Sequence, residues 1–134
     1  MSKYKDEFKE EFTVWGRKLE LDVIFHLYKG EEMSEHQIRT YEDLKANHVK
    51  YFDSVKDEIY EYVEEDTGDE DLPENIFKFV MPKTIIIYRE HNKFDEEPLE
   101  FALLCDYKYN IDDGISVSFE NGESTGVGSE DVAL

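Results

Sequence analysis

The sequence predicts an α+β fold, in which a long amphipathic helix packs on one face of an antiparallel sheet of about five to six strands. Three observations support this fold class: strand-like alternation before residue 28, an unbroken helical period over 34–66, and several short strand-like segments after residue 80. The predicted order is two strands, a long helix, a short helix and three or four strands. We expect a single domain over residues 1–134, with 1–7 and 129–134 loose.

The first two strands form a predicted hairpin. Apolar residues at 19, 21, 23, 25 and 27 alternate with a more polar set, which is typical of a strand with one face on a core. Phe8, Phe12 and Val14 continue this alternation upstream. Gly16-Arg17 is expected to form the turn between the two strands.

Residues Ser34 to Asp66 predict one long helix. Ser34 and Gln37 have the spacing of a capping box, which marks a helix start. A straight helix of this length would extend about 50 Å, which exceeds the width of a globule of this size. The helix is therefore expected either to bend near Tyr51 to Ser54 or to overhang the sheet. One stripe carries its apolar residues and one histidine: Ile38, Tyr41, Leu44, His48, Phe52, Val55, Ile59, Tyr62 and Val63.

Turn signals divide the C-terminal half. Pro73 is expected to open a short helix over Glu74–Val80, which Met81-Pro82 ends. Asn121-Gly122 predicts a type I′ hairpin turn. The predicted strands are Lys83–Arg89 and Leu99–Tyr109, both apolar on two faces and therefore central, Gly114–Glu120, and a short strand over Ser124–Gly128.

Charge is the strongest compositional signal. The chain has 34 acidic and 15 basic residues, and its net charge is −19. Such a charge repels nucleic acid and anionic membranes and attracts basic partners. The lone Cys105 cannot form a disulfide within the chain, and no apolar run approaches the length that spans a bilayer, so we expect a cytoplasmic protein.

Few residues suggest catalysis or metal binding. His48 lies within the apolar stripe and is expected to be partly buried and hydrogen bonded, and Cys105 to be a packed thiol. No histidine pair has the spacing of a zinc site, and no glycine-rich phosphate loop is present. We therefore expect no catalytic residues, no metal and no cofactor. One loop carries a secondary group of candidates, Asp106, Tyr107, Asp112 and Asp113, whose carboxylates leave calcium binding or a metal-dependent hydrolase as alternatives.

The acidic end of the long helix is the main functional candidate. Between Asp57 and Glu74 there are ten acidic residues and no basic one, whereas a solvated helix face normally interleaves both signs. The helix dipole also disfavours carboxylates at a C-terminus. This pattern indicates a surface for a basic partner, with Tyr28, Tyr60 or Tyr109 as aromatic anchors. Its residues are Glu58, Glu61, Glu64, Glu65, Asp66, Asp69, Glu70 and Asp71.

The C-terminal half resembles a bacterial family of short acidic domains of unknown function. The resemblance rests on Leu103-Leu104-Cys105-Asp106-Tyr107, Gly114-Ile115-Ser116-Val117, Asn121-Gly122 and the closing Gly128-Ser129-Glu130-Asp131. The hairpin around Trp15-Gly16 and the helix with Gln37 are also similar, so it covers most of the chain. The family turn usually carries Glu-His-Gly, where this chain has Asp112-Asp113-Gly114. The family has no established activity, and some of its members are described as immunity proteins encoded near toxin genes.

These observations favour a non-enzymatic acidic protein-binding module. One form that such a module can take is an immunity protein that neutralises a basic, nuclease-like toxin. The alternatives are a structural or regulatory domain that associates through the sheet edge at Ser124–Gly128, and a metal-dependent hydrolase that uses Asp106, Asp112 and Asp113.

Overall fold

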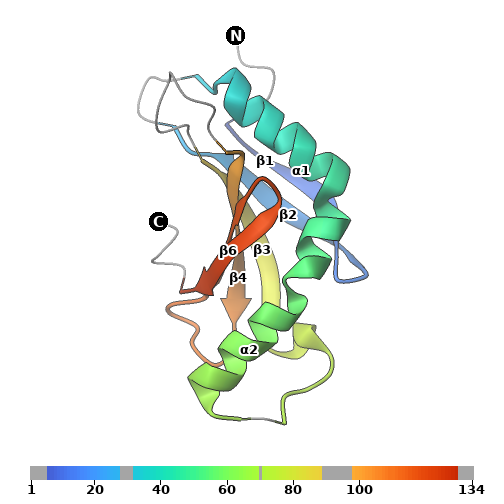
Figure 1. Ribbon diagram of the computed structural model, residues 1–134, viewed down its shortest axis with the longest axis vertical. Coiled ribbons are helices and arrows are strands. Elements are labelled where there is room, and N and C mark those ends of the chain that lie inside the picture. Colours follow the sequence, from blue (N-terminus) through green and yellow to red (C-terminus); the bar gives the residue numbers. More distant parts are fainter. Residues whose placement is uncertain (1–5, 28–31, 70, 89–97, 130–134) are drawn as a thin grey trace.

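The computed structural model describes residues 6–27, 32–69, 71–88 and 98–129. The fold contains one six-stranded sheet. The elements are β1 (Glu7–Val14), β2 (Arg17–Phe25), α1 (Glu35–Ser54), α2 (Lys56–Thr67), the 3-10 helix η1 (Ile76–Lys78), β3 (Val80–Ile87), β4 (Glu100–Tyr107), β5 (Ile115–Glu120) and β6 (Glu123–Gly128). Figure 1 shows α1 and α2 along one face of the sheet. The α+β class predicted from the sequence is confirmed.

The strands follow the order β1-β2-β3-β4-β5-β6 across the sheet. Four of the five strand pairs are antiparallel, as predicted, but β2 and β3 are parallel, so the sheet is mixed. The parallel pair follows from the connection, because a chain that leaves β2 and returns through the helices can place β3 in the same direction. β3 and β4 are central, as their two apolar faces predicted.

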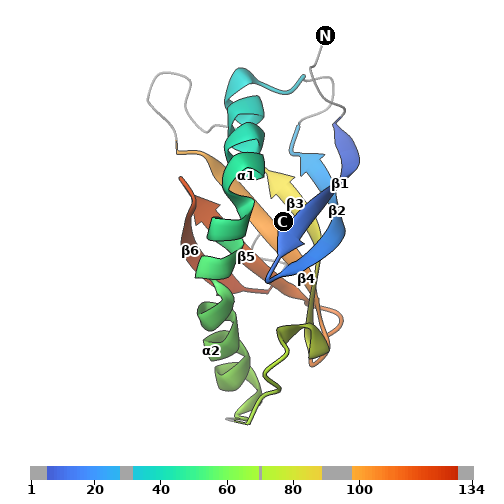
Figure 2. The ribbon, with the colours of Figure 1, turned by 90° about the vertical axis from the view of Figure 1, so that its right-hand side faces the viewer.

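The predicted single helix is two helices. The hydrogen-bond pattern changes at Val55, whose N–H bonds to the Phe52 carbonyl at 3.3 Å, and α2 starts at Lys56. Figures 1 and 2 show the change of direction, which lies one residue beyond the segment predicted to bend. Phe52, Val55 and Ile59 are all fully buried, so the bend lets both helices keep apolar residues on the curved sheet.

The start of α1 is hydrogen bonded to the end of β2. Ser34 accepts from the Gln37 N–H at 3.1 Å, and the Gln37 side chain accepts from the Ser34 N–H, which confirms the capping box. The buried Gln37 amide also donates to the carbonyl of His26, at the end of β2, at 2.9 Å. One side chain thus caps the helix and satisfies a backbone acceptor beside the parallel strand pair.

One turn departs from the sequence-based prediction, and another confirms it. The β1–β2 turn is centred on Trp15 and Gly16, both at positive φ, rather than on Gly16-Arg17. The positive φ of Trp15 is stabilised by a hydrogen bond in the core, in which its indole N–H donates to the Phe52 carbonyl at 2.9 Å. The Asn121-Gly122 turn has φ values of 51° and 83°, as a type I′ turn requires.

The segment before β3 also differs from the prediction. The short helix is a single 3-10 turn over Ile76–Lys78 instead of Glu74–Val80, and Met81-Pro82 already lies in β3. The strand register shifts between Pro82 and Thr84. Such an irregularity tolerates a proline, which has no N–H to donate to a neighbouring strand.

The half-buried His48 and the buried Cys105 have the roles predicted for them. His48 Nε2 accepts from the Thr13 N–H at 3.0 Å, and its Nδ1 lies 2.9 Å from the Lys45 carbonyl. Cys105 is a fully buried thiol. Among the residues described above, no helix is both long and apolar enough to cross a membrane.

β1 begins at Glu7, inside the segment expected to be loose, while 1–5 and 130–134 lie outside the described residues.

Candidate functional site

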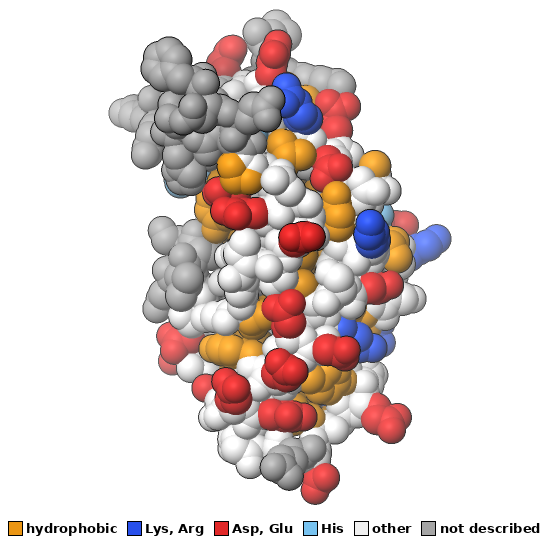
Figure 3. All heavy atoms as spheres, in the orientation of Figure 1, with side chains coloured by type: hydrophobic (Ala, Val, Ile, Leu, Met, Phe, Trp, Pro, Cys, Tyr) orange, Lys and Arg blue, Asp and Glu red, His pale blue; other side chains and the backbone are white. Residues whose placement is uncertain are grey.

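The acidic face is the exposed surface of α2 and of the segment that follows it. Ile59 and Val63 are fully buried against the core, so the carboxylates between and after them face solvent. Figure 3 shows acidic side chains over the lower part of this view, where α2 lies. The acidic face consists of Glu58, Glu61, Glu64, Glu65, Asp66, Asp69 and Asp71, all exposed. The eighth predicted residue, Glu70, lies outside the described residues.

No cation of the described chain neutralises the acidic face. The ion pairs between described residues lie elsewhere, between Lys9 and β2, between Lys45 and Glu10, and between Lys83 and Asp106. The bend at Val55 eases part of the conflict with the helix dipole, because Asp57 and Glu58 now lie in a first turn, where negative charge is favoured. The carboxylates from Glu61 onward gain no such compensation.

Three carboxylates of the acidic face hold local structure. Asp66 Oδ2 accepts from the Tyr107 hydroxyl at 2.8 Å, and Glu58 Oε2 accepts from the Ser124 hydroxyl at 2.9 Å. Asp69 Oδ1 accepts from the Asp71 N–H at 2.8 Å, which forms a turn after Gly68 ends α2 in the left-handed conformation. The side chains of Glu61, Glu64 and Glu65 form no hydrogen bond or ion pair with described residues, and all three are exposed to solvent.

The structure brings the two predicted acidic groups together at one end of the molecule. Tyr107, from the secondary candidates, donates to Asp66 of the acidic face across 41 positions of sequence. Burial raises the pKa of the Tyr62 hydroxyl, and the charges of Asp66 and Asp113 add to this rise. Burial and the hydrogen bond to Asp66 likewise raise the pKa of Tyr107. Both hydroxyls therefore keep their protons beside the carboxylates, and that of Tyr107 donates to Asp66.

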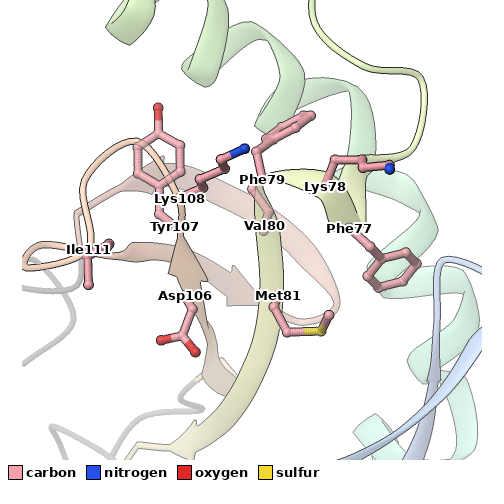
Figure 4. Close-up of a pocket in the computed structure, with 9 residues that line it drawn as sticks. All are labelled: Phe77, Lys78, Phe79, Val80, Met81, Asp106, Tyr107, Lys108 and Ile111. Atoms are coloured by element: carbon pink, nitrogen blue, oxygen red, sulfur yellow. The ribbon is translucent and has the colours of Figure 1, made fainter.

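The remaining secondary candidates do not converge. Asp106 leaves β4 on the opposite side from Tyr107, as Figure 4 shows, and its carboxylate lies 3.1 Å from Lys83 Nζ. Asp113 caps its own loop, where Asn110 Nδ2 donates to it at 2.8 Å, and Asp112 is exposed. Within the described ranges, no three His, Cys, Asp or Glu side chains are grouped so that they could hold a metal ion.

The predicted aromatic anchors have different surroundings. The Tyr60 hydroxyl donates to the Pro73 and Glu74 carbonyls, so it fixes the segment after α2. Tyr109 remains 44% exposed, and its ring stacks on Phe79. Tyr28 lies outside the described residues. Of the three, Tyr109 is the described tyrosine best placed to contact a partner, at the same end of the molecule as Asp66 and Asp113.

Together, fold and site define a small α+β domain with a mixed sheet, a bent two-helix layer and an unneutralised acidic surface on the second helix. The chain belongs to the family described as "Domain of unknown function (DUF6985)", whose family model matches residues 2–134. This confirms that the chain is a member of a domain family without an assigned function. No curated protein and no solved structure matches the chain.

Proposed function

We propose that this domain is a non-enzymatic binding module that recognises a basic protein through the acidic face of α2. The observation that carries the proposal is the set of exposed carboxylates, Glu61, Glu64 and Glu65 above all, for which the described chain provides no cation. Like charges at i,i+4 spacing, such as Glu61 and Glu65, cost a helix a few tenths of a kcal/mol per pair. The fold gains nothing in return, which favours a role in recognition.

The rest of the surface supports the same role. A net charge of −19 raises the rate of encounter with a positively charged protein, and the local charge on α2 then orients the partner. Affinity in such complexes comes mainly from a few side chains that become buried in the interface. Tyr109, which is exposed at this end of the molecule, can supply one of them.

The partner we favour is a nuclease-like toxin, which makes the domain an immunity protein. A protein that binds nucleic acid presents cations spaced to meet phosphates, and carboxylates spaced along a helix are suited to occupy those cations. Such binding would cover the nucleic-acid-binding surface of the toxin and block substrate entry without any chemical step.

Retention of proteins from lysate of the source cell, at about 50 mM and about 300 mM salt, tests the proposal. A basic protein held at low salt and released at high salt is expected, because screening weakens interactions between exposed charges. The double variant Glu61→Lys with Glu64→Lys should lose that protein while keeping the fold, as measured by circular dichroism. The matched control is Glu7→Lys with Glu11→Lys, which changes the net charge equally at exposed positions of β1. Equal retention by both variants would rule out α2 as the interface.

One observation favours a second candidate function. β6 is an edge strand, and residues 124–128 contain neither a charge nor a proline that would protect the edge. A domain that associates through this edge would form complexes that resist salt, because backbone hydrogen bonds would hold them. Self-association that persists at about 300 mM salt, measured by light scattering, would favour this alternative over the acidic-face proposal.

A further inference from the structure

A second surface lies beside the acidic end of the molecule and has the opposite character. The start of β3, the end of β4 and the 3-10 turn line an open pocket of about 240 Å³, whose residues are shown in Figure 4. Its lining is mainly apolar and aromatic. The residues are Phe77, Lys78, Phe79, Val80, Met81, Asp106, Tyr107, Lys108 and Ile111.

Exposed apolar side chains gather at this pocket. The described residues include four large hydrophobic side chains with substantial exposure, and three of them lie here. Ile111 is 82% exposed and Met81 is 36% exposed, and both line the pocket. Tyr109 is 44% exposed and directly follows a lining residue, Lys108, in the sequence. The fourth, Val49, is on α1. Exposed apolar residues that cluster in a concave site mark binding surfaces more often than scattered ones do.

The aromatic walls of the pocket are fixed before any ligand enters. Phe77 lies between Trp15, at 5.7 Å between ring centroids, and the Arg17 guanidinium, which lies 4.1 Å from the Phe77 ring centre. Phe79 stacks on Tyr109 at 6.0 Å. Rings held in this way lose little conformational entropy on binding, which favours affinity.

Cations surround this pocket in a chain that is otherwise acidic. After α2, the described chain has three basic residues, Lys78, Lys83 and Lys108. Lys78 and Lys108 line the pocket and form no ion pair with described residues, whereas Lys83 neutralises Asp106 at 3.1 Å. The pocket therefore offers an apolar floor flanked by two lysines that remain available to an anion.

We propose that this pocket docks an acidic peptide segment by one large apolar side chain, with carboxylates on either side of it bound to Lys78 and Lys108. Size favours this ligand, because pockets for complete small molecules or cofactors usually exceed about 300 Å³. Charge excludes a basic segment, which the acidic face would attract instead. The proposal is independent of the function of α2, since the two surfaces select opposite charges.

A labelled peptide, Gly-Glu-Glu-Phe-Glu-Glu-Gly, tests the proposal at about 150 mM salt, where the long-range repulsion from the net charge is largely screened. Two comparison peptides replace Phe by Gly or all Glu by Lys. The acidic Phe peptide should bind best in fluorescence polarisation. It should also shift the backbone amide resonances of Phe77, Met81 and Ile111 in NMR spectra.

Charge reversal at the pocket supplies the decisive variant. Lys78→Glu with Lys108→Glu should weaken binding by about tenfold or more, since it replaces two attractions by repulsions. The matched control, Arg39→Glu with Lys50→Glu, makes the same charge change at exposed positions of α1 and should have little effect. All four side chains are exposed, so neither variant should disturb folding.

Ile111→Asp tests the apolar contact separately, with Val49→Asp as its control, because both side chains are exposed. Loss of binding only in Ile111→Asp is expected. Equal binding of the acidic and basic peptides, equal losses in the pocket and α1 variants, or resonance shifts confined to other residues would each overturn the proposal. Failure here leaves the salt-dependent test of α2 unaffected, because that test uses a basic partner.

Discussion

α1 and α2 lie end to end on the same face of the sheet, but the fold uses their charged residues differently. On α1, Lys45 donates to the Glu11 carbonyl at 2.6 Å and pairs with Glu10 at 3.4 Å. Burial alone would raise the pKa of Glu10, but the Tyr41 hydroxyl and Lys45 outweigh it and lower that pKa. On α2, Glu61, Glu64 and Glu65 have no such partners among described residues. The difference separates charges that attach a helix to the sheet from charges that no described residue neutralises.

The largest expected effect tests whether the end of α1 holds the layer together. Phe52 is fully buried, and its ring meets those of Phe12 and Phe119. Phe52→Ala should therefore lower the free energy of unfolding by about 3–5 kcal/mol. Urea denaturation followed by circular dichroism measures this change. A loss below about 1 kcal/mol would mean that α1 is not anchored at this point.

Gly122→Ala tests the contact between α1 and the β5–β6 turn. Gly122 has a φ of 83°, and a Cβ there would lie 2.3 Å from the Tyr51 ring. The variant should lose about 2–4 kcal/mol, from backbone strain and overlap together. Gly16→Ala is the matched control, because Gly16 has a φ of 81° and open space around it. It should lose only about 1–2 kcal/mol, and equal losses would show that the Tyr51 contact is unimportant.

A smaller effect concerns the Tyr51 hydroxyl, which donates to Asp43 within α1 at 2.8 Å. Burial and the Asp43 carboxylate raise the pKa of Tyr51 to about 12 in the folded protein, against about 10 in the unfolded chain. The neutral form stabilises the fold below about pH 10, and this contribution is lost as pH rises from about 10 through 12. Tyr51→Phe should cost about 0.5–1 kcal/mol at neutral pH and reduce the loss of stability above pH 10, as measured by denaturation at several pH values.

The smallest effect sharpens the comparison most. Glu61→Gln with Glu65→Gln removes a like-charged pair from α2 and should raise stability by a few tenths of a kcal/mol. Thermal unfolding at low salt can detect this gain, and added salt should abolish it. A clear loss of stability would contradict the conclusion that these carboxylates serve no purpose in the fold.

Local sequence signals predicted most helices and strands, but not which strands pair with each other in the sheet. Period-2 and period-3.6 patterns, the Ser34 cap and the Asn121-Gly122 turn each act over a few residues, so the sequence displays them directly. The parallel pairing of β2 with β3 leaves no such signal, because a buried strand reads the same beside a parallel or antiparallel neighbour. Trp15 at positive φ was also not predictable, since its distant bond to Phe52 stabilises that conformation.

The candidate sites divide in the same way. The acidic face could be predicted because its residues lie on consecutive turns of α2 and in the segment directly after it. Its link to Tyr107 could not, because that hydrogen bond joins residues 41 positions apart. The pocket was not predicted, although Asp106 and Tyr107 of its lining were candidates, because Phe77 and Ile111 come from separate segments and neither carries a motif.

The parallel pairing of β2 with β3 also has a consequence for the order of folding. β1–β2 and the meander from β3 to β6 pair strands that follow one another in the sequence, whereas Asp22 pairs with Thr84 only after the chain between them closes. Closure of a long loop costs entropy before its contacts repay it, and such pairing slows folding. The hairpin and the meander should therefore form early, and the union of the two halves should limit the rate.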